Sequence, residues 1–252
     1  MRIQVMSVKA IILVAVGVSA MLAGCTSLSQ ATPAAKADSL PPIRIVLAGD
    51  STVADCPPEM PNRGWGQMFK DYLTGPVELI NLAEGGQSTN SFRTSGKWQQ
   101  VLDRKADFIL IQFGHNDEPG HDDRTTDPNT TYRANLIRFV DEARARGAKP
   151  ILVTPVSRMH MRPDGAVSNK LKVYADAMKA VASQKSVPLV DLNTASAELY
   201  AKLGPAGMTE LGCGGADRTH FSPKGAKVIA GLVAKALPDA CPGLKPYIKP
   251  PR

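Results

Sequence analysis

A serine and a histidine that lie far apart in the sequence together suggest nucleophilic chemistry. Ser51 ends the tripeptide Gly49-Asp50-Ser51, directly after an apolar run, and His220 follows Asp217 by three residues. A serine hydroxyl needs a base to take its proton, and the base needs an anion to fix its tautomer and stabilise its charged form. Because one turn can present Asp217 and His220 together, we predict Ser51 as a nucleophile, His220 as its base and Asp217 as the orienting anion.

Each of these clusters, taken alone, also has an ordinary structural interpretation. A Gly-Asp-Ser turn can end any strand, and Asp217 can cap a surface loop beside an unrelated histidine. The G-x-S-x-G elbow of the α/β-hydrolases is absent from the chain, which disfavours that fold.

Two further loops carry groups that could stabilise a negatively charged oxygen. Asn116 lies in the segment Gly-His-Asn-Asp and offers a side-chain NH₂ group, the donor that a developing oxyanion requires. Gly86 lies in the segment Glu-Gly-Gly-Gln-Ser, where a glycine lets the backbone bring an N–H close to the same oxygen. We expect His115 to brace the loop of Asn116. Ordinary loop structure is the alternative for both segments.

Short apolar runs separated by amphipathic segments predict alternating strands and helices. The nearly continuous apolar runs suit strands buried on both faces of a parallel sheet. The expected strands are residues 43–48, 77–82, 108–113, 151–156 and 189–192. The expected helices are residues 64–73, 91–105, 131–146, 171–184 and 223–237. Ser222 and Pro223 suit the N-cap and first position of the last helix.

This alternation implies right-handed crossovers and an α/β fold, a flavodoxin-like doubly wound five-stranded parallel sheet. Ligands of such sheets bind in the crevice at the carboxyl ends of the strands. The polar loops 49–63, 83–90, 114–129 and 157–168 fall at these ends. We therefore expect the candidate residues to meet there.

In this order, the four loops resemble those of the SGNH (GDSL) hydrolase superfamily. The matching residues are Ser51 in GDS, Gly86 in EGGQS, Asn116 in FGHND, and Asp217 with His220 in DRTH. The resemblance implies the SGNH hydrolase fold and His220 acting first as general base and then as general acid. It also implies an oxyanion hole formed by the N–H groups of Ser51 and Gly86 and the side chain of Asn116.

Longer segments are similar to the rhamnogalacturonan acetylesterase branch of that superfamily, over residues 43 to about 237. These segments are GDSTV (49–53), GWGQ (64–67), QFGHND (112–117), VTPVSR (153–158) and DRTHFSPKGA (217–226). One departure is Gln87, where an arginine is expected in a GGRS turn of that branch. The departure leaves Gly86 in place and weakens only inferences about charge recognition beside the oxyanion hole.

Three other residues are candidate contacts to substrate. Arg158 and His160 lie on the loop after the fourth expected strand. Trp65 stands beside the nucleophile loop, although core packing is the more ordinary role of a tryptophan. The sequence His121-Asp122-Asp123 is interpreted as a solvated loop, and we predict no metal site and no cofactor.

Three cysteines fall within the expected domain. Cys56, Cys213 and Cys241 fit no C-x-x-C metal or redox pattern. An exported protein can form one disulfide among them, and the pairs Cys56–Cys213 and Cys213–Cys241 stay open alternatives.

The first 24 residues have the pattern of a bacterial lipoprotein signal peptide. Arg2 and Lys9 precede an apolar run that ends at Leu22-Ala23-Gly24-Cys25. The ending resembles a lipobox, so Cys25 is the expected lipidation site. An ordinary signal peptide cut nearby is the alternative.

The lipidated residue would be followed by a flexible tether over residues 25–42, rich in Ala, Ser, Thr and Pro, and by a hydrolase domain over residues 43–252. Thr26 after the cysteine favours the outer membrane by analogy with lipoprotein sorting, facing the periplasm or the cell surface. We expect contact with the membrane through the Cys25 lipid anchor only.

The charge and aromatic content disfavour a nucleic-acid partner. The formal net charge is +7, and removal of the signal peptide with its two basic residues would leave +5. The chain has no Lys/Arg run, and aromatic residues make up 5% of it. A moderately basic surface suits a polyanionic substrate.

We expect a monomeric serine esterase that removes O-acetyl groups from a cell-wall polysaccharide, with rhamnogalacturonan pectin as the expected substrate. Alternatives within enzymes are an esterase for acetylxylan or another glycan, and a lipid-directed esterase, which the polar loops disfavour. The alternative from another class is a surface lipoprotein that binds glycans without hydrolysing them.

Overall fold

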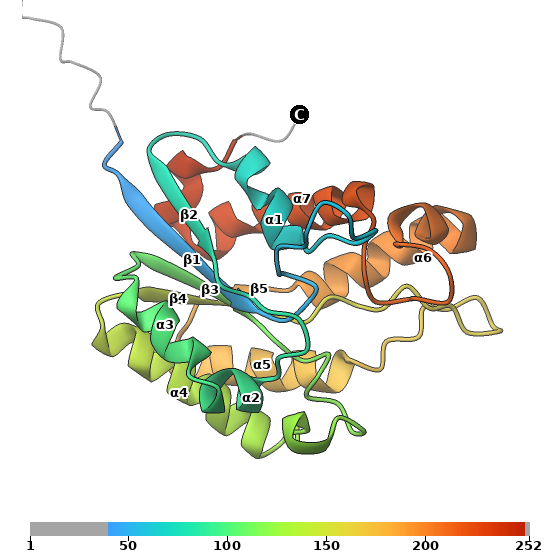
Figure 1. The fold of residues 1–252 in the computed structure, drawn as a ribbon, viewed down its shortest axis with the longest axis horizontal. Helices are drawn as coiled ribbons and strands as arrows, with labels where there is room; N and C mark the ends of the chain where they lie inside the picture. The colour runs from blue at the N-terminus through green and yellow to red at the C-terminus, as the bar shows by residue number, and fades with distance from the viewer. Residues whose placement is uncertain (1–39, 250–252) are drawn as a thin grey trace, which may run out of the picture. The chain divides into compact units, whose positions relative to one another are not determined.

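A computed structural model describes residues 40–249 of the chain. The predicted signal peptide, Cys25 and all but the last residues of the predicted tether lie outside the described residues. The described part contains a parallel sheet with helices on both faces (Figure 1). The predicted α/β, doubly wound five-stranded sheet is therefore confirmed.

The sheet has the strand order β2-β1-β3-β4-β5, and every neighbouring pair is parallel. The strands are β1 (Ile43–Gly49), β2 (Val77–Asn81), β3 (Phe108–Gln112), β4 (Lys149–Val153) and β5 (Leu189–Val190). Successive side chains of a strand point to opposite faces. In β1, Ile45 and Leu47 enter one hydrophobic core while Val46 and Ala48 enter the other. This explains why the strands are apolar without alternation.

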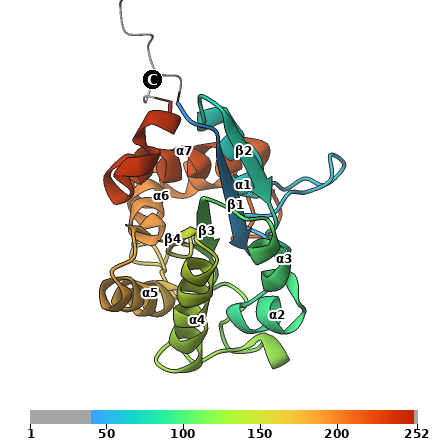
Figure 2. The ribbon, with the colours of Figure 1, turned by 90° about the vertical axis from the view of Figure 1, so that its left-hand side faces the viewer.

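Two layers of helices cover these faces (Figure 1). One face packs against α1, α6 and α7, and the other packs against α2, α3, α4 and α5. Figure 2 shows α4 alongside α5 and α2 in the second layer. The helices are α1 (Trp65–Phe69), α2 (Thr89–Thr94), α3 (Lys97–Asp103), α4 (Thr131–Ala145), α5 (Lys172–Lys185), α6 (Leu192–Leu211) and α7 (Pro223–Ala240). Short 3₁₀ helices are η1 (Lys70–Tyr72), η2 (Asp122–Arg124) and η3 (Pro242–Tyr247).

The helices differ from the prediction in two places. Helix α6 was not predicted, and it contains Gly204 and Pro205, two residues that disfavour a continuous helix. The structure accommodates them as a kink, with Gly204 at φ 64° and Pro205 starting a second helical segment, where a missing N–H costs little. The single helix expected at 91–105 is divided into α2 and α3 by Gly96, whose φ of 78° no continuous helix allows.

The strand order fixes where a ligand can bind. The chain leaves β1 toward β2 on one side, and β3 lies on the other side of β1, so the topology switches between β1 and β3. A crevice forms at the carboxyl ends of the strands at such a point. Within residues 40–249, no helix combines the length and apolar character needed to cross a bilayer.

Candidate active site

The turn that carries Ser51 is held rigidly from within. The backbone oxygen of Asp50 accepts from the N–H groups of Val53 and Ala54, each at 3.0 Å. Its carboxylate Oδ1 accepts from the Thr52 N–H at 2.9 Å and from the Thr52 hydroxyl at 2.7 Å. Asp50 is fully buried, whereas Ser51 is partly exposed. The turn therefore faces Ser51 outward and keeps its neighbours inside.

Gln112, at the end of β3, ties this turn to the core. Its Nε2 donates to the Thr52 hydroxyl at 2.6 Å, and its Oε1 accepts from the Trp65 indole at 2.8 Å. Trp65, the first residue of α1, is only 1% exposed and packs in the core. The expectation that Trp65 contacts substrate is therefore wrong, because its ring is closed to solvent and its single donor is used.

The structure brings Ser51, His220 and Asp217 together. Ser51 Oγ lies 2.9 Å from His220 Nε2, and His220 Nδ1 lies 2.8 Å from Asp217 Oδ2. An ionised carboxylate only accepts, so Nδ1 carries the proton and Nε2 is left to accept from the Ser51 hydroxyl. This is the geometry that general-base activation of a serine requires.

Asp217 is kept ionised by the backbone around it. Its Oδ1 accepts from the N–H groups of Thr219 at 2.7 Å and His220 at 2.9 Å. Partial burial raises the pKa of this carboxyl, but the hydrogen bonds from His220 and Thr219 outweigh burial and lower the pKa to about 2. The carboxylate is thus charged throughout the range in which a neutral histidine can act as a base.

The loop before α7 sets the position of His220. Phe221 is fully buried and forms isolated bridges with Arg63 and Gly212, and the His220 carbonyl accepts from the Cys213 N–H at 3.1 Å. The next residue, Ser222, caps α7 by accepting from the Gly225 N–H, as predicted. The histidine is therefore fixed on both sides, by a buried phenylalanine and by a helix cap.

Gly86 follows β2 in a turn that needs its conformation. The chain after β2 continues beside β1, with the Glu84 N–H donating to the Gly49 carbonyl at 3.0 Å. Gly86 has φ 79°, a left-handed conformation that favours glycine. Its carbonyl accepts from the Arg124 guanidinium at 3.0 Å. Within the described part of the chain, the N–H groups of Ser51 and Gly86 donate to no acceptor.

Asn116 is held against the same turn. Its Nδ2 donates to the Gln87 carbonyl at 3.0 Å, and the residue is partly exposed. An amide NH₂ group has two donors, so this contact leaves the second one for a ligand. Asn116, Gly86 and Ser51 follow the carboxyl ends of β3, β2 and β1, the edge at which the sequence predicted them to meet.

The next residue, Asp117, anchors the Asn116 loop in the core. Its carboxylate accepts from the Thr89 hydroxyl at 2.5 Å, the Thr126 hydroxyl at 2.7 Å and the Thr89 N–H at 3.1 Å. Asp117 is fully buried, and burial raises its pKa to about 7 against the effect of these donors.

His115 and Asp50 form a second contact between the two loops. His115 Nδ1 lies 3.3 Å from Asp50 Oδ2 without hydrogen-bond alignment, so the contact is electrostatic. Burial alone would raise the pKa of Asp50, but the charge interaction with His115 and the donors of Thr52 lower it. The predicted bracing role of His115 is consistent with this position.

The remaining predicted residues lie at the margins of the site. Arg158 pairs with Glu118 at 2.7 Å and also donates to the Thr219 hydroxyl at 3.2 Å, while His160 is exposed. Cys56, Cys213 and Cys241 are free thiols in the described chain, so neither disulfide alternative is formed. No group of His, Cys, Asp or Glu in residues 40–249 has an arrangement that could hold a metal ion.

Ser51, His220 and Asp217 lie together at the switch point of a doubly wound sheet, and backbone N–H groups without acceptors lie beside the serine. These features define the class of protein as a hydrolase that attacks acyl groups. A comparison with known families supports this class. The model of the GDSL-like Lipase/Acylhydrolase family matches residues 47–228. The chain belongs to this family, and it is a carboxylic ester hydrolase.

Three relatives illustrate the similarity. The rhamnogalacturonan acetylesterase RhgT of Bacillus subtilis is 40% identical over 222 residues, which cover 82% of this chain and 94% of the relative. The crystal structure of the Bacillus subtilis protein YxiM aligns with a TM-score of 0.71 and 26% identity, over 79% of this chain and 57% of that one. An acetylxylan esterase from Geobacillus stearothermophilus has a TM-score of 0.61 at 19% identity, over 79% and 93% of the two chains, which shows a shared fold.

Sequence reasoning missed the residues that hold the site in place. Gln112 lies in the QFGHND segment, but nothing in the sequence indicates its bonds to Thr52 and Trp65. The contact of Arg124 with Gly86 joins loops that are 38 residues apart. Such contacts carry no local pattern, and only the folded chain reveals them.

Proposed function

We propose that this protein is a serine acetylesterase that removes O-acetyl groups from a rhamnogalacturonan-type pectin. The observation that carries the proposal is the position of His220, within hydrogen-bond distance of both the Ser51 hydroxyl and the Asp217 carboxylate. In the proposed roles, Ser51 is the nucleophile, His220 the general base and acid, and Asp217 the residue that orients the histidine.

The first half of the reaction transfers the acetyl group to the enzyme. Ser51 Oγ attacks the acetyl carbonyl carbon while its proton passes to His220 Nε2. The carbonyl oxygen becomes negative and accepts from the N–H groups of Ser51 and Gly86 and from the second donor of Asn116. The bond from the carbonyl carbon to the sugar oxygen then breaks, and His220 returns the proton to that oxygen. The products are a deacetylated sugar and acetyl-Ser51.

The second half returns the enzyme to its starting state. Water attacks the acetyl carbonyl and gives a proton to His220, and the same donors stabilise the oxyanion. When the bond to Ser51 Oγ breaks, His220 protonates the serine oxygen and acetate leaves. Each half-reaction uses His220 Nε2 once as base and once as acid. The Nδ1 proton stays in place throughout, and the Asp217 carboxylate holds it.

The exposure of the site supports a large polar substrate. The side chains of His220 and Asp217 are 31% and 34% exposed, so the reacting groups lie near the surface. Exposed large hydrophobic side chains within residues 40–249 are Met60, Val173 and Leu203, which come from three separate segments. A lipid-directed esterase needs a contiguous apolar surface, whereas an ester on a polysaccharide needs an open one. The similarity to RhgT supports rhamnogalacturonan as the polymer.

The proposal is tested by acetate release from a panel of substrates: acetylated rhamnogalacturonan, acetylated xylan and a long-chain fatty acyl ester. We expect the highest kcat/KM on rhamnogalacturonan and little hydrolysis of the fatty ester. Activity on acetylated xylan alone would show that xylan, and not rhamnogalacturonan, is the substrate. Binding of these polymers without acetate release would identify a glycan-binding protein and refute the proposed catalysis.

We also propose that the enzyme is a lipoprotein of a bacterial outer membrane, anchored through Cys25. The proposal is supported by the apolar run that ends at Leu22-Ala23-Gly24-Cys25 and by the Ala-, Ser- and Pro-rich segment that follows. A tether of that composition would let the domain reach a polymer that cannot enter the bilayer.

A further inference from the structure

A cavity of about 460 Å³ lies beside the candidate active site and has a basic lining. Its volume is in the range of pockets that bind small molecules, roughly 300–1,000 Å³. Six of the residues that line it are polar or charged: Glu118, Arg158, His160, Ser168, Lys170 and Arg218. The reaction described above uses none of them.

The cations of this cavity are not all neutralised. Glu118 pairs with Arg158 at 2.7 Å, so these two charges offset one another. Within the described chain, Lys170 and Arg218 form no ion pair with a carboxylate. The cavity therefore presents two unpaired positive charges, together with the exposed imidazole of His160 and the hydroxyl of Ser168. Such a lining favours an anion that also has hydroxyl groups.

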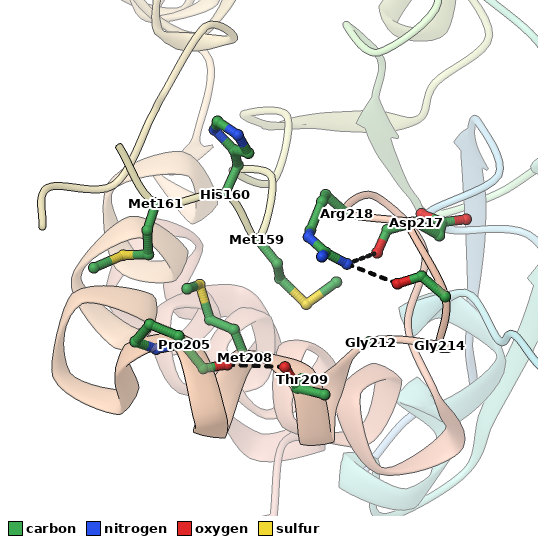
Figure 3. Close-up of a pocket in the computed structure, with 11 residues that line it drawn as sticks. Met159, His160, Met161, Pro205, Met208, Thr209, Gly212, Gly214, Asp217 and Arg218 are labelled. Atoms are coloured by element: carbon green, nitrogen blue, oxygen red, sulfur yellow. Dashed lines mark hydrogen bonds between the residues drawn. The ribbon is translucent and has the colours of Figure 1, made fainter. Parts of the chain in front are cut away.

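The Arg218 guanidinium is held in place before any ligand arrives. Its Nη1 donates to the carbonyl oxygens of Gly215 at 3.0 Å and Asp217 at 3.1 Å (Figure 3). The Arg218 carbonyl accepts from the Met159 N–H at 2.8 Å, which ties this loop to the one after β4. The other guanidinium nitrogens keep donors for a carboxylate.

The cavity is linked directly to the catalytic residues. Glu118 lies two residues after Asn116, and Arg218 lies between Asp217 and Thr219. Arg158 donates to the Thr219 hydroxyl at 3.2 Å, one residue before His220. A sugar seated in the cavity would therefore be close to a sugar whose ester lies at Ser51.

We propose that this cavity binds the carboxylate of a uronic acid residue of the polysaccharide, close to the ester that is cleaved. The inference rests on the proposed function, because that function makes the substrate a pectic polysaccharide. The anionic groups of such a polymer are carboxylates. Arg218 and Lys170 supply the charge, and His160 and Ser168 face the ring hydroxyls.

A second cavity adjoins the first. This cavity, of about 380 Å³, shares His160 and Arg218 with the first, and the sulfur-bearing side chains of Met159, Met161 and Met208 line it (Figure 3). The two cavities therefore form adjacent parts of one surface, and the lining of the second mixes the methionines with the polar side chains of Thr209, Asp217 and Arg218.

The test compares two forms of one acetylated rhamnogalacturonan oligosaccharide, with free carboxylates and with methyl-esterified carboxyls. Wild-type enzyme should deacetylate the free acid with a kcat/KM at least about tenfold higher than that of the methyl ester, and added salt should reduce the difference.

Lys170→Ala and Arg218→Gln should each lower this preference for the free acid severalfold by raising KM. Lys170→Ala is the safer variant, because Arg218 also supports the loop of Asp217. Lys172→Ala is the matched control, since Lys172 pairs with Asp176 and does not line the cavity; it should keep the wild-type preference.

The outcomes separate the two proposals. Equal rates on the two forms, or a preference that both cavity variants keep, would overturn the carboxylate site while leaving the acetylesterase function intact. Acetate release from neither form, with a simple acetate ester still hydrolysed, would overturn the proposed function and the carboxylate site with it.

Discussion

His115 and Asp50 face each other across 3.3 Å in a space that solvent does not reach. Asp50 immediately precedes Ser51, and His115 immediately precedes Asn116. The pair therefore joins the loop that carries the proposed nucleophile to the loop that carries a proposed oxyanion donor. A change in either partner should be felt in both loops.

The first prediction is that His115→Ala destabilises the protein. Removal of the imidazole takes away a side chain that lowers the pKa of the buried Asp50 carboxyl and so favours its ionised form, which should cost roughly 3 kcal/mol in the free energy of unfolding. Urea unfolding measures the loss. His160→Ala, at an exposed position, is the control and should change stability by less than about 0.5 kcal/mol.

Adding Asp50→Asn to His115→Ala should recover part of that loss, because no buried charge is then left unpaired. If the two side chains act independently, the destabilisation of the double variant will equal the sum of the losses measured for His115→Ala and Asp50→Asn alone. That result would contradict the proposed coupling.

The second prediction concerns the oxyanion donors. Asn116→Ala should lower kcat by roughly 10²- to 10³-fold with little change in KM, because charge reaches the carbonyl oxygen only in the transition state. Steady-state kinetics on a small acetate ester measure the split. A change confined to KM would make Asn116 a substrate contact instead.

Gly86→Ala should act differently from Asn116→Ala. The variant keeps the backbone N–H, but its φ of 79° is strained for alanine, and the new Cβ would lie 3.3 Å from the flexible Arg124 guanidinium. We expect both kcat and KM to change as the turn shifts. A variant with wild-type kinetics would remove Gly86 from the proposed oxyanion hole.

The chemical groups of the site could be predicted from sequence, and their supports could not. Ser51, Gly86 and Asn116 stand in short motifs at strand ends, and in a parallel sheet all such ends meet at one edge. His220 stands in a short motif just before α7. Trp65 shows the limit. A tryptophan beside the nucleophile loop fits either a sugar contact or a core residue, and only its burial decides.

The helices show the same division. Ser222 and Pro223 start α7 as local rules predict, because capping depends on neighbours in sequence. Helix α6 is interrupted at Gly204, and a second helical segment starts at Pro205, yet both segments bury side chains in the core, Tyr200 in the first and Met208 and Leu211 in the second. Tertiary contacts of this kind leave no local signal.

The third prediction is a pH dependence of stability that originates at Asp117. Burial raises its pKa to about 7, whereas its ordinary value is 3.8. Between these values the folded chain holds a proton that the unfolded chain has released, so stability should fall as pH rises from about 4 to about 7. Urea unfolding across this range should show a flatter profile for Asp117→Asn than for wild type.

The exposed Asp123→Asn is the matched control for Asp117 and should keep the wild-type slope. If Asp117→Asn also keeps that slope, the proton is held elsewhere in the protein.

The fourth prediction tests the lipid anchor. Cys25→Ser removes the thiol that would receive the lipid, so the enzyme should move from the membrane pellet to the soluble fraction. Fractionation followed by activity measurement shows the change, and Cys56→Ser serves as the control that should stay with the membrane. Continued membrane binding of the Cys25 variant would point to another anchor.

The most direct test of the catalytic proposal is acetate release by Ser51→Ala, with circular dichroism confirming that the variant is folded. The substitution deletes one hydroxyl at a partly exposed position, so the fold should be retained. Because Ser51 is proposed to form the covalent acetyl intermediate, kcat should fall by roughly 10⁴- to 10⁶-fold. A folded Ser51→Ala enzyme that releases acetate at a rate near that of wild type would contradict the account.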